Sequence, residues 1–442
     1  MATSSTIMDS NSFKAEDMEN LDEATRQMVE RRAILGPSYR LFYHKPLNFV
    51  RGRGTRLFDA DGEEYLDVYN NIPSLGHSHP KVAEAVSKQM GLINTHTRYL
   101  HENILHYAED LLSTMPSELD RIMFLLSGSE ANDLAVRIAK SYTGGTGVIV
   151  TSEAYHGNTD LITKLSPSIG ADAPMAIDMR MIPTPDTYRL GTDDIGAWMA
   201  QHVEAQIADM KRHGIKFAAL LVDTIFSSDG VFPGKPGFLQ PVIETVHREG
   251  GVFIADEVQP GFTRTGEGFW GFERHGIVPD IVTMGKPMAN GIACSGVAAK
   301  TDVLDAFAQS SPYFNTFAGS PVAMAAAQAT LDAMREEDTL GNAKRVGTAM
   351  REALNSLAKD HPLLGDVRGA GLFTGVDVVK PGTTEPDYAT AVRIIEGMRE
   401  RHVLVSLCGP YGNVLKVRPP LVFSLDDLDW FTDALSGTLA SL

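Results

Sequence analysis

Cysteine, long apolar runs and a secretory leader are what this sequence lacks most clearly. Cys294 and Cys408 are its only cysteines, and neither lies in a spacing typical of a zinc site or a disulfide framework. No apolar run reaches the length of about 18 residues that would indicate a membrane helix. The opening MATSSTIMDS has neither the basic start nor the apolar stretch of a secretory signal. We therefore expect a cytoplasmic protein with no membrane partner.

Positive charge is also scarce. The chain carries 39 lysines and arginines against 56 aspartates and glutamates, a formal net charge of −17, and no basic block interrupts this balance. A nucleic-acid backbone would be repelled over most of such a molecule. The composition therefore argues against nucleic acid as a partner.

The rest of the composition is that of a folded protein. Hydrophobic residues make up 43% and charged residues 21% of the 442 positions, and no internal repeat stands out. This length exceeds what one compact core usually holds. We therefore expect two or three structural units.

Short apolar runs alternate with helical stretches through the middle of the chain. These runs are RIMFLL (121–126), TGVIVTS (146–152), FAALLVDT (217–224), GVFIAD (251–256) and DIVTMG (280–285). Such runs are typical of a parallel sheet covered on both faces. The sequence thus predicts an α/β fold with a large domain over residues 69–325. We assign 1–33 to an N-terminal arm or helix, and 34–68 with 326–442 to a smaller α+β domain built from both chain ends.

Two charged residues follow neighbouring apolar runs. Asp256 ends GVFIAD, and Lys286 comes directly after DIVTMG. Either residue alone is more often a surface or turn group, but parallel strands bring their carboxyl ends to one edge of a sheet, where α/β folds bind ligands. Pyridoxal phosphate needs a lysine that bonds to its aldehyde and a carboxylate that keeps its pyridine nitrogen protonated. We therefore predict this cofactor, with Lys286 and Asp256 at its two ends.

Further residues match the other demands of this cofactor. Ser127, Gly128 and Ser129 follow the first apolar run and open a helix, whose N-terminus can hold a phosphate. Tyr155 follows the second run and is placed to stack on the ring. Gln259, three residues after Asp256, is placed to donate a hydrogen bond to the ring hydroxyl.

Two other patterns are weaker. GEGFWG (266–271) matches the dinucleotide fingerprint, but it follows polar residues and no helical pattern opens after it. His77 and His79 have no further candidate ligands nearby and fit a turn that opens the helix VAEAVSKQM. We predict neither a dinucleotide nor a metal site.

A set of motifs in fixed order carries a family resemblance. They are SGSEAN, EAYHG, ADEVQPGFTRTG, PDIVTMGKPMANG, YFNTFAGSP and KVRPP. From about Leu35 to the C-terminus the sequence resembles class III aminotransferases of the fold-type-I pyridoxal-phosphate enzymes. The resemblance implies a large domain with a mainly parallel seven-stranded sheet between helices. It also implies a homodimer with shared active sites, and leaves open whether dimers pair into tetramers.

The resemblance also implies residue roles. Lys286 would bond to the cofactor and act as general base, with Asp256, Gln259, Tyr155 and the Ser127–Ser129 loop as predicted above. Thr316 would reach the cofactor phosphate of the neighbouring subunit, Arg418 would bind a substrate carboxylate bidentately, and Tyr69 would line the substrate pocket.

The predicted reaction is aminotransfer by a ping-pong mechanism, from a primary amine or a β- or ω-amino acid to a keto acid such as pyruvate. Asp223 stands where many relatives have a glutamate, which in them neutralises the substrate-binding arginine when an uncharged side chain occupies the site. Aspartate is shorter, so the sequence departs from the family pattern at this position. The stretches YNNIPSLGHSHP and DEVQPGF resemble a branch that includes both amine transaminases and phospho-lyases. The alternative is therefore a phospho-lyase acting on a phosphorylated amino alcohol such as phosphoethanolamine.

Overall fold

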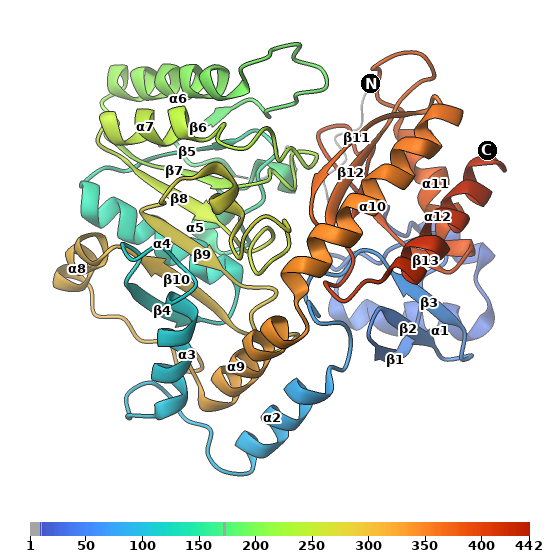
Figure 1. Cartoon of the computed structure of the whole chain (residues 1–442), viewed down its shortest axis with the longest axis horizontal. Coiled ribbons are helices and arrows are strands. Elements are labelled where there is room, and N and C mark those ends of the chain that lie inside the picture. Colours follow the sequence, from blue (N-terminus) through green and yellow to red (C-terminus); the bar gives the residue numbers. More distant parts are fainter. Residues whose placement is uncertain (1–8, 10, 171–173) are drawn as a thin grey trace.

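A seven-stranded sheet forms the centre of the larger part of the molecule (Figure 1). The structure is a computed structural model that describes residue 9 and residues 11–170 and 174–442. In spatial order the strands are β4 (Arg121–Leu125), β10 (Ser295–Ala299), β9 (Ile281–Met284), β8 (Val252–Asp256), β7 (Phe217–Asp223), β5 (Gly147–Thr151) and β6 (Met179–Ile182). Only β10 among them runs antiparallel to its neighbours, β4 and β9. The predicted α/β fold with a mainly parallel sheet is confirmed.

Helices cover both faces of this sheet. They are α4 (Gly128–Thr143), α5 (Asp160–Thr163), α6 (Ile195–Arg212), α7 (Gln240–Arg248) and α8 (Thr301–Ser310), with the short turns η3 (Pro167–Ile169) and η4 (Gly271–His275) between strands. Alternate residues of one strand enter different cores: Leu220 packs with the α6 and α7 side, and Leu221 with the α4 side. This two-faced burial explains why the strands are continuously apolar in sequence.

The two chain ends meet in the smaller part of the molecule, where β3 pairs parallel with β13. One sheet there has the order β1 (Phe49–Arg53), β2 (Arg56–Asp59), β3 (Glu64–Asp67) and β13 (Val403–Leu404). A second, antiparallel sheet has the order β11 (Leu364–Ala370), β12 (Phe373–Val378), β15 (Val414–Val417) and β14 (Ser406–Cys408). The expectation of a smaller α+β unit built from both ends is thus confirmed, and its boundaries at residues 33, 68 and 325 stay predictions.

The remaining helices frame these sheets (Figure 1). They are η1 (Ala15–Asn20), α1 (Glu23–Arg31), η2 (Arg32–Leu35), α2 (Pro80–Met90), α3 (Glu102–Leu112), α9 (Pro321–Glu336), α10 (Thr339–Asp360), α11 (Tyr388–Glu400) and α12 (Leu425–Leu439). Within the described residues, none of the helices has the length and apolar character needed to cross a bilayer.

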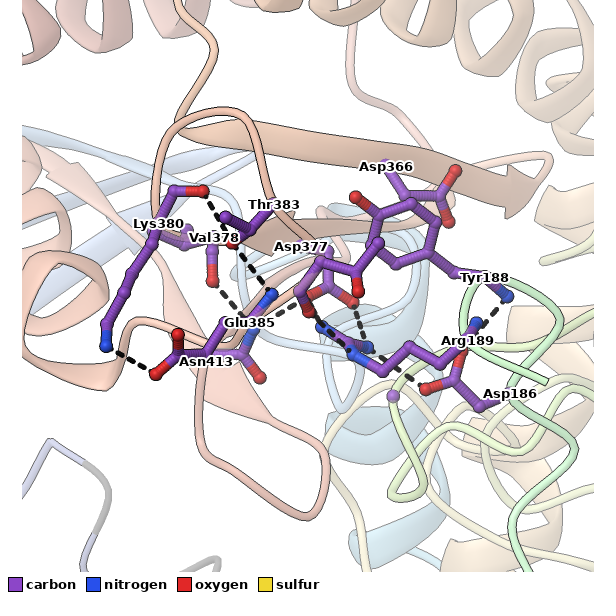
Figure 2. A network of polar contacts seen from close by, with 12 residues as sticks. Asp186, Tyr188, Arg189, Asp366, Asp377, Val378, Lys380, Thr383, Glu385 and Asn413 are labelled. Carbon is purple, nitrogen blue, oxygen red and sulfur yellow. Dashed lines mark hydrogen bonds and ion pairs between the residues drawn. The ribbon is translucent and has the colours of Figure 1, made fainter. Parts of the chain in front are cut away.

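An ionic network joins the antiparallel sheet β11–β12–β15–β14, called the small sheet below, to the larger part of the molecule (Figure 2). Asp377 of β12 is fully buried and accepts hydrogen bonds from Arg189 (2.6 Å), Asn413 (2.6 Å) and Arg368 (3.0 Å). Arg189 comes from the loop after β6, whereas Arg368 lies on β11 and also donates to the carbonyl of Gly230, at 3.0 Å from its Nε. The network therefore ties together segments that are far apart in sequence.

Candidate active site

A cavity of about 450 Å³ lies at the carboxyl ends of the central strands. It is lined from the large part of the molecule and, through Ser406, Lys416 and Arg418, from the small sheet. Of the residues predicted for the site, the cavity brings together Tyr69, Ser127, Gly128, Ser129, Tyr155, Asp256, Gln259, Lys286 and Arg418. Its volume lies within the range of small-molecule sites, roughly 300–1,000 Å³.

The acid and the amine reach this cavity because their strands are neighbours. β8 and β9 pair in parallel, with Asp256 opposite Thr283. Asp256 is the last residue of β8, and Lys286 follows β9 by two residues. The predicted meeting of these side chains at one edge of the sheet is what the structure shows, and their chemical roles stay a proposal.

Asp256 is held in place by three groups. Its Oδ2 lies 2.7 Å from Nδ1 of His156 and accepts a hydrogen bond from Nδ2 of Asn132 at 2.9 Å, and its Oδ1 accepts from the amide of Val258 at 3.0 Å. Asn132 in turn accepts from the hydroxyl of Thr283 at 2.7 Å. A carboxylate fixed in this way is oriented before any ligand arrives.

His156 and Asn132 are residues that the sequence reasoning missed. They belong to the quoted motifs EAYHG and SGSEAN, but no local pattern indicates that they meet Asp256, because the contacts span 100 and 124 residues. Nε2 of His156 is buried and has no hydrogen-bond partner among the described residues. An unpaired buried nitrogen is costly and is usually explained by a ligand or by function.

The side-chain amine of Lys286 is a weaker base than that of an ordinary lysine, because its pKa is lowered. Burial, and next the positive charge of Arg418, lower its pKa to about 8, while Asp256 and Asp223 act in the opposite direction. A larger fraction of this amine is therefore neutral near physiological pH than in an exposed lysine. A neutral amine is the form that attacks a carbonyl carbon and that accepts a proton.

The N-terminus of α4 forms another wall of the cavity. Ser127 is its N-cap, and its hydroxyl accepts from the amide of Glu130 at 3.2 Å. A Cβ added to Gly128 would lie 2.9 Å from both methyl groups of Val258, so glycine is required for this close approach. The backbone N–H groups of Gly128 and Ser129, which open α4, together with the helix dipole make this end of α4 suitable for a phosphate.

Arg418 is anchored by neutral oxygens. Its Nε and Nη2 donate to the carbonyl of Tyr69 at 3.1 and 3.0 Å, and its Nη1 donates to Oε1 of Gln259. These contacts use three of the five guanidinium N–H groups. Because the amide oxygen of Gln259 faces Arg418, its amide nitrogen is the group that it can offer to a cofactor oxygen.

Lys416 is a second buried lysine in the cavity, and the sequence reasoning did not select it. Its side chain is buried, and burial together with Arg418 lowers its pKa to about 7. The signal was present in KVRPP, because Lys416 and Arg418 are two residues apart on an extended segment and so share a face.

Thr316 and Asp223, both singled out from the sequence, make other contacts in this chain than the cofactor-phosphate contact and the arginine pairing considered for them. Thr316 is exposed and does not line the cavity of its own chain, so its contact across a dimer interface stays a prediction. Asp223 accepts from the amide of Ile225 at 3.0 Å and from the hydroxyl of Ser227, and it has no hydrogen bond to Arg418. Burial, and next the charge of Asp256, raise the pKa of Asp223.

The donor set fits pyridoxal phosphate. A buried amine, an oriented carboxylate, a tyrosine and a helix N-terminus line one cavity, and each meets one demand of that cofactor. No group of three or more His, Cys, Asp or Glu side chains that could hold a metal ion is present among the described residues.

Comparison with known proteins identifies the family. The model of the family "Aminotransferase class-III" matches residues 41–439. A Drosophila melanogaster protein named alanine–glyoxylate aminotransferase 2-like is 38% identical over 92% of this chain and 85% of its own length.

Solved structures agree with this match. A phospholyase from Arthrobacter in complex with phosphoethanolamine is 41% identical, with a TM-score of 0.91 over 94% of this chain and all of the other. An amine transaminase from an uncultivated Pseudomonas species, with pyridoxal phosphate bound, is 28% identical, with a TM-score of 0.82 over 90% of this chain and 95% of the other. The predicted resemblance and cofactor are thereby confirmed: the chain belongs to the class III aminotransferases and is a pyridoxal-phosphate-dependent enzyme of the transaminase type.

Proposed function

We propose that this enzyme moves an amino group from a primary amine or a β- or ω-amino acid to a keto acid such as pyruvate. The observation that carries the proposal is that the amine of Lys286, with its lowered pKa, lines the same cavity as the oriented carboxylate of Asp256. When bound, pyridoxal phosphate supplies an electron sink for the carbanion left when the substrate loses its proton. The chain's own residues hold the substrate and move that proton.

Each of these residues has a defined task. Lys286 removes the proton from the substrate carbon with its neutral Nζ and returns it at the position required for transfer. Asp256, fixed by His156 and Asn132, would hold the ring nitrogen of the bound cofactor and keep it protonated. Arg418, fixed by Tyr69 and Gln259, presents its remaining N–H groups to the anionic end of the substrate.

A second candidate reaction is elimination of phosphate from a phosphorylated amino alcohol. It begins with the same proton removal by Lys286, after which the C–O bond to the phosphate at the β-carbon breaks. Water then releases an aldehyde and ammonia. Lys416 favours this candidate, because it adds a second cation beside Arg418, and the 41%-identical phospholyase supports it.

A dimer is part of the proposal. Large apolar side chains are exposed near Thr316, with Phe317 66% accessible, and also in the segment after α2, where Tyr99 and Leu100 are 66% and 97% accessible. Burial of these residues against a second copy would bring Thr316 to a neighbouring cavity. A cytoplasmic site of action is likewise proposed and is supported by the two free, buried cysteines.

An assay of products separates the two reactions. The holoenzyme is mixed with a panel of amines in the presence and absence of pyruvate, and alanine and phosphate are measured together. Aminotransfer predicts alanine that appears only with pyruvate. Phosphate released from phosphoethanolamine without any keto acid would instead establish elimination, and no product from any amine would refute both.

A further inference from the structure

The stretch GHSHP (76–80) contains a histidine, His77, that the proposed reaction does not use. Nε2 of His77 lies 2.7 Å from Oδ2 of Asp67, the last residue of β3. The side chain of Asp67 is fully buried and that of His77 is 18% accessible, and neither residue lines the cavity. This hydrogen bond therefore closes a loop of the chain, residues 68–76, from outside the cavity.

The ends of loop 68–76 are also fixed to the turn between β1 and β2. The backbone of His77 exchanges hydrogen bonds with that of Gly54, at 2.8 and 3.0 Å, and the amide of Asp67 donates to the carbonyl of Thr55 at 2.8 Å. A Cβ added to Gly52 would lie 2.7 Å from Cβ of His77, so the ring packs closely against β1. The side chain of His77 is thus held in place where it meets Asp67.

Hydrogen bonds from loop 68–76 reach three parts of the active site. The carbonyl of Tyr69 accepts from Arg418, Nδ2 of Asn71 donates to the carbonyl of Gln259 at 3.2 Å, and Oγ of Ser74 donates to the carbonyl of Pro287, the residue after Lys286, at 3.0 Å. Tyr69 itself lines the cavity. A change in the position of this loop would therefore be felt in the cavity.

One peptide group connects Asp67 directly to Arg418. The carbonyl of Tyr69 and the amide of Asn70 belong to the same planar unit. Its N–H donates to Oδ1 of Asp67 at 2.9 Å, and its C=O accepts from Nε and Nη2 of Arg418 at 3.1 and 3.0 Å. Because the N–H and the C=O of a trans peptide point in opposite directions, Asp67 and Arg418 hold this rigid unit from its two sides. A continuous series of hydrogen bonds thus runs from His77 to Arg418.

The charge of Asp67 strengthens this series. Burial alone would raise the pKa of Asp67, but the hydrogen bonds from His77 and from the amides of Asn70 and Tyr69 lower it below its ordinary value. An ionised carboxylate polarises the peptide group that donates to it, and so strengthens the bond that the carbonyl of this group accepts. Arg418, which has no described carboxylate within 4.0 Å, is therefore stabilised by a carboxylate acting through one peptide group.

We propose that His77 is a positioning residue of the active site, whose hydrogen bond to Asp67 sets the orientation of Arg418 and so the affinity of the cavity for the anionic end of a substrate. His77 acts only through Asp67 and the peptide group between Tyr69 and Asn70. The inference rests on the proposed function, in which Arg418 binds that end, and it is independent of whether transfer or elimination follows. The competing explanation is that His77 stabilises the fold alone.

The test uses holoenzyme reduced with borohydride, in which the cofactor is fixed and no turnover occurs. Isothermal titration compares propionate with propionamide, which have the same shape and differ in charge. The wild type should bind propionate about tenfold more tightly, because only propionate carries a charge for Arg418. Equal affinity for the two ligands would overturn the proposal, since Arg418 would then not read the charge.

Two variants of His77 differ only in reach. The amide nitrogen of glutamine lies close to where Nε2 of histidine lies, whereas that of asparagine is one methylene short of it. His77→Asn should weaken binding of propionate about 10- to 100-fold, the loss expected when a charged group loses an orienting hydrogen bond, and should leave the affinity for propionamide within about threefold. His77→Gln should restore most of the affinity for propionate. Equal losses for both ligands, or no gain of His77→Gln over His77→Asn, would contradict the proposal.

The matched control is His79→Asn. His79 belongs to the same stretch and also meets one carboxylate, its Nε2 lying 2.9 Å from Oε1 of Glu337, but this pair lies outside loop 68–76. The control should leave both affinities within about threefold. A loss of propionate affinity equal to that in His77→Asn would contradict a specific role for the hydrogen bond to Asp67.

Gly52→Ala replaces His77→Asn if that variant does not fold. The added Cβ would lie 2.7 Å from Cβ of His77, so it displaces the ring without changing its chemistry. Binding of propionate should again weaken more than binding of propionamide. An unchanged ratio of the two affinities would overturn the proposal.

The product assay keeps the two claims apart. Aminotransfer by the wild type, together with an unchanged affinity of His77→Asn for propionate, would refute this inference alone. A lower affinity of His77→Asn for propionate, together with no product from any amine, would refute the proposed function alone.

Discussion

Two regions of this molecule bury charge in opposite ways. In the joint between the antiparallel sheet of the smaller part and the larger part, Asp377 accepts hydrogen bonds from Arg189 and Asn413 (Figure 2) and also from Arg368. In the cavity, Lys416 and Arg418 lie together with no carboxylate within 4.0 Å among the described residues. The first arrangement pairs its cations with a carboxylate, and the second places its cations together without one at that distance.

This difference in charge pairing distinguishes a structural region from a functional one. Hydrogen bonds to Asp377 and Asp186 raise the pKa of Arg189 although burial alone would lower it, so the joint favours the charged form. In the cavity, burial and then the positive charge of Arg418 lower the pKa values of Lys286 and Lys416 to about 8 and about 7. Groups with perturbed pKa values and no structural partner are candidates for binding and catalysis.

The largest effect is expected from breaking the complete network. Asp377→Ala leaves the buried Arg368 and the partly buried Arg189 without their shared partner and should lower the free energy of unfolding by about 3–5 kcal/mol, measured by urea denaturation. The control is Asp366→Ala, because Asp366 is 29% accessible and pairs with Arg368 alone. Equal losses of stability in the two variants would show that Asp377 contributes no more to the fold than the more exposed Asp366.

Removal of the ammonium group of Lys416 should change the free energy of unfolding in the opposite direction. Lys416→Met should raise the free energy of unfolding by about 1–2 kcal/mol, because replacing a buried charge by an apolar side chain of similar volume is often stabilising. A loss of stability comparable to that of Asp377→Ala would mean that Lys416 is a structural residue.

The sign of the pH dependence follows from the lowered pKa of Lys416. The folded value is about 7 and the unfolded value about 10.4, so between these values the unfolded chain binds more protons and stability rises with pH. The advantage of Lys416→Met should therefore be largest near pH 6 and should shrink by pH 9. An advantage independent of pH would contradict this.

The weakened base of Lys286 gives a kinetic prediction. The rate at which apoenzyme bonds to pyridoxal phosphate should rise with pH and level off above about 8, the pKa of Lys286, because only the neutral amine reacts. Arg418→Met removes the largest positive neighbour and should shift this midpoint upward. Stopped-flow absorbance measures both curves, and a midpoint near 10 in the wild type would refute the argument.

The smallest effect is expected at the edge of the joint. Lys380 and Glu385 form an ion pair there (Figure 2), but their side chains are 55% and 59% accessible. Solvent screens such a pair, so Lys380→Met should leave the urea midpoint unchanged within error. A clear loss would mean that exposed and buried pairs are not as different as proposed.

Much of this architecture was readable from local pattern. The five apolar runs became strands, and the ends of two of them placed Asp256 and Lys286 together. β10 escaped prediction because its sequence, SGVAA, consists mostly of small residues with a weak apolar signal. β6 escaped as well, being a short strand at the edge of the sheet whose Met181 is exposed.

The site was predicted less completely than the fold, for a physical reason. His156 and Asn132 gain their importance from contacts with Asp256, which lies more than 90 residues away in sequence. Lys416 is notable because no carboxylate among the described residues lies within 4.0 Å of its ammonium group, and such a separation is a property of tertiary structure. The anchoring of Arg418 by Tyr69 and Gln259 likewise joins three distant segments.

The most direct test of the account is to find the lysine that bonds to the cofactor. Holoenzyme is reduced with borohydride and digested, and the modified peptide is sequenced by mass spectrometry. The account predicts the adduct on Lys286 alone. Because Lys416 lines the same cavity and has an even lower pKa, of about 7, it is the informative competitor. An adduct on Lys416, or on no lysine of the cavity, would contradict the central claim.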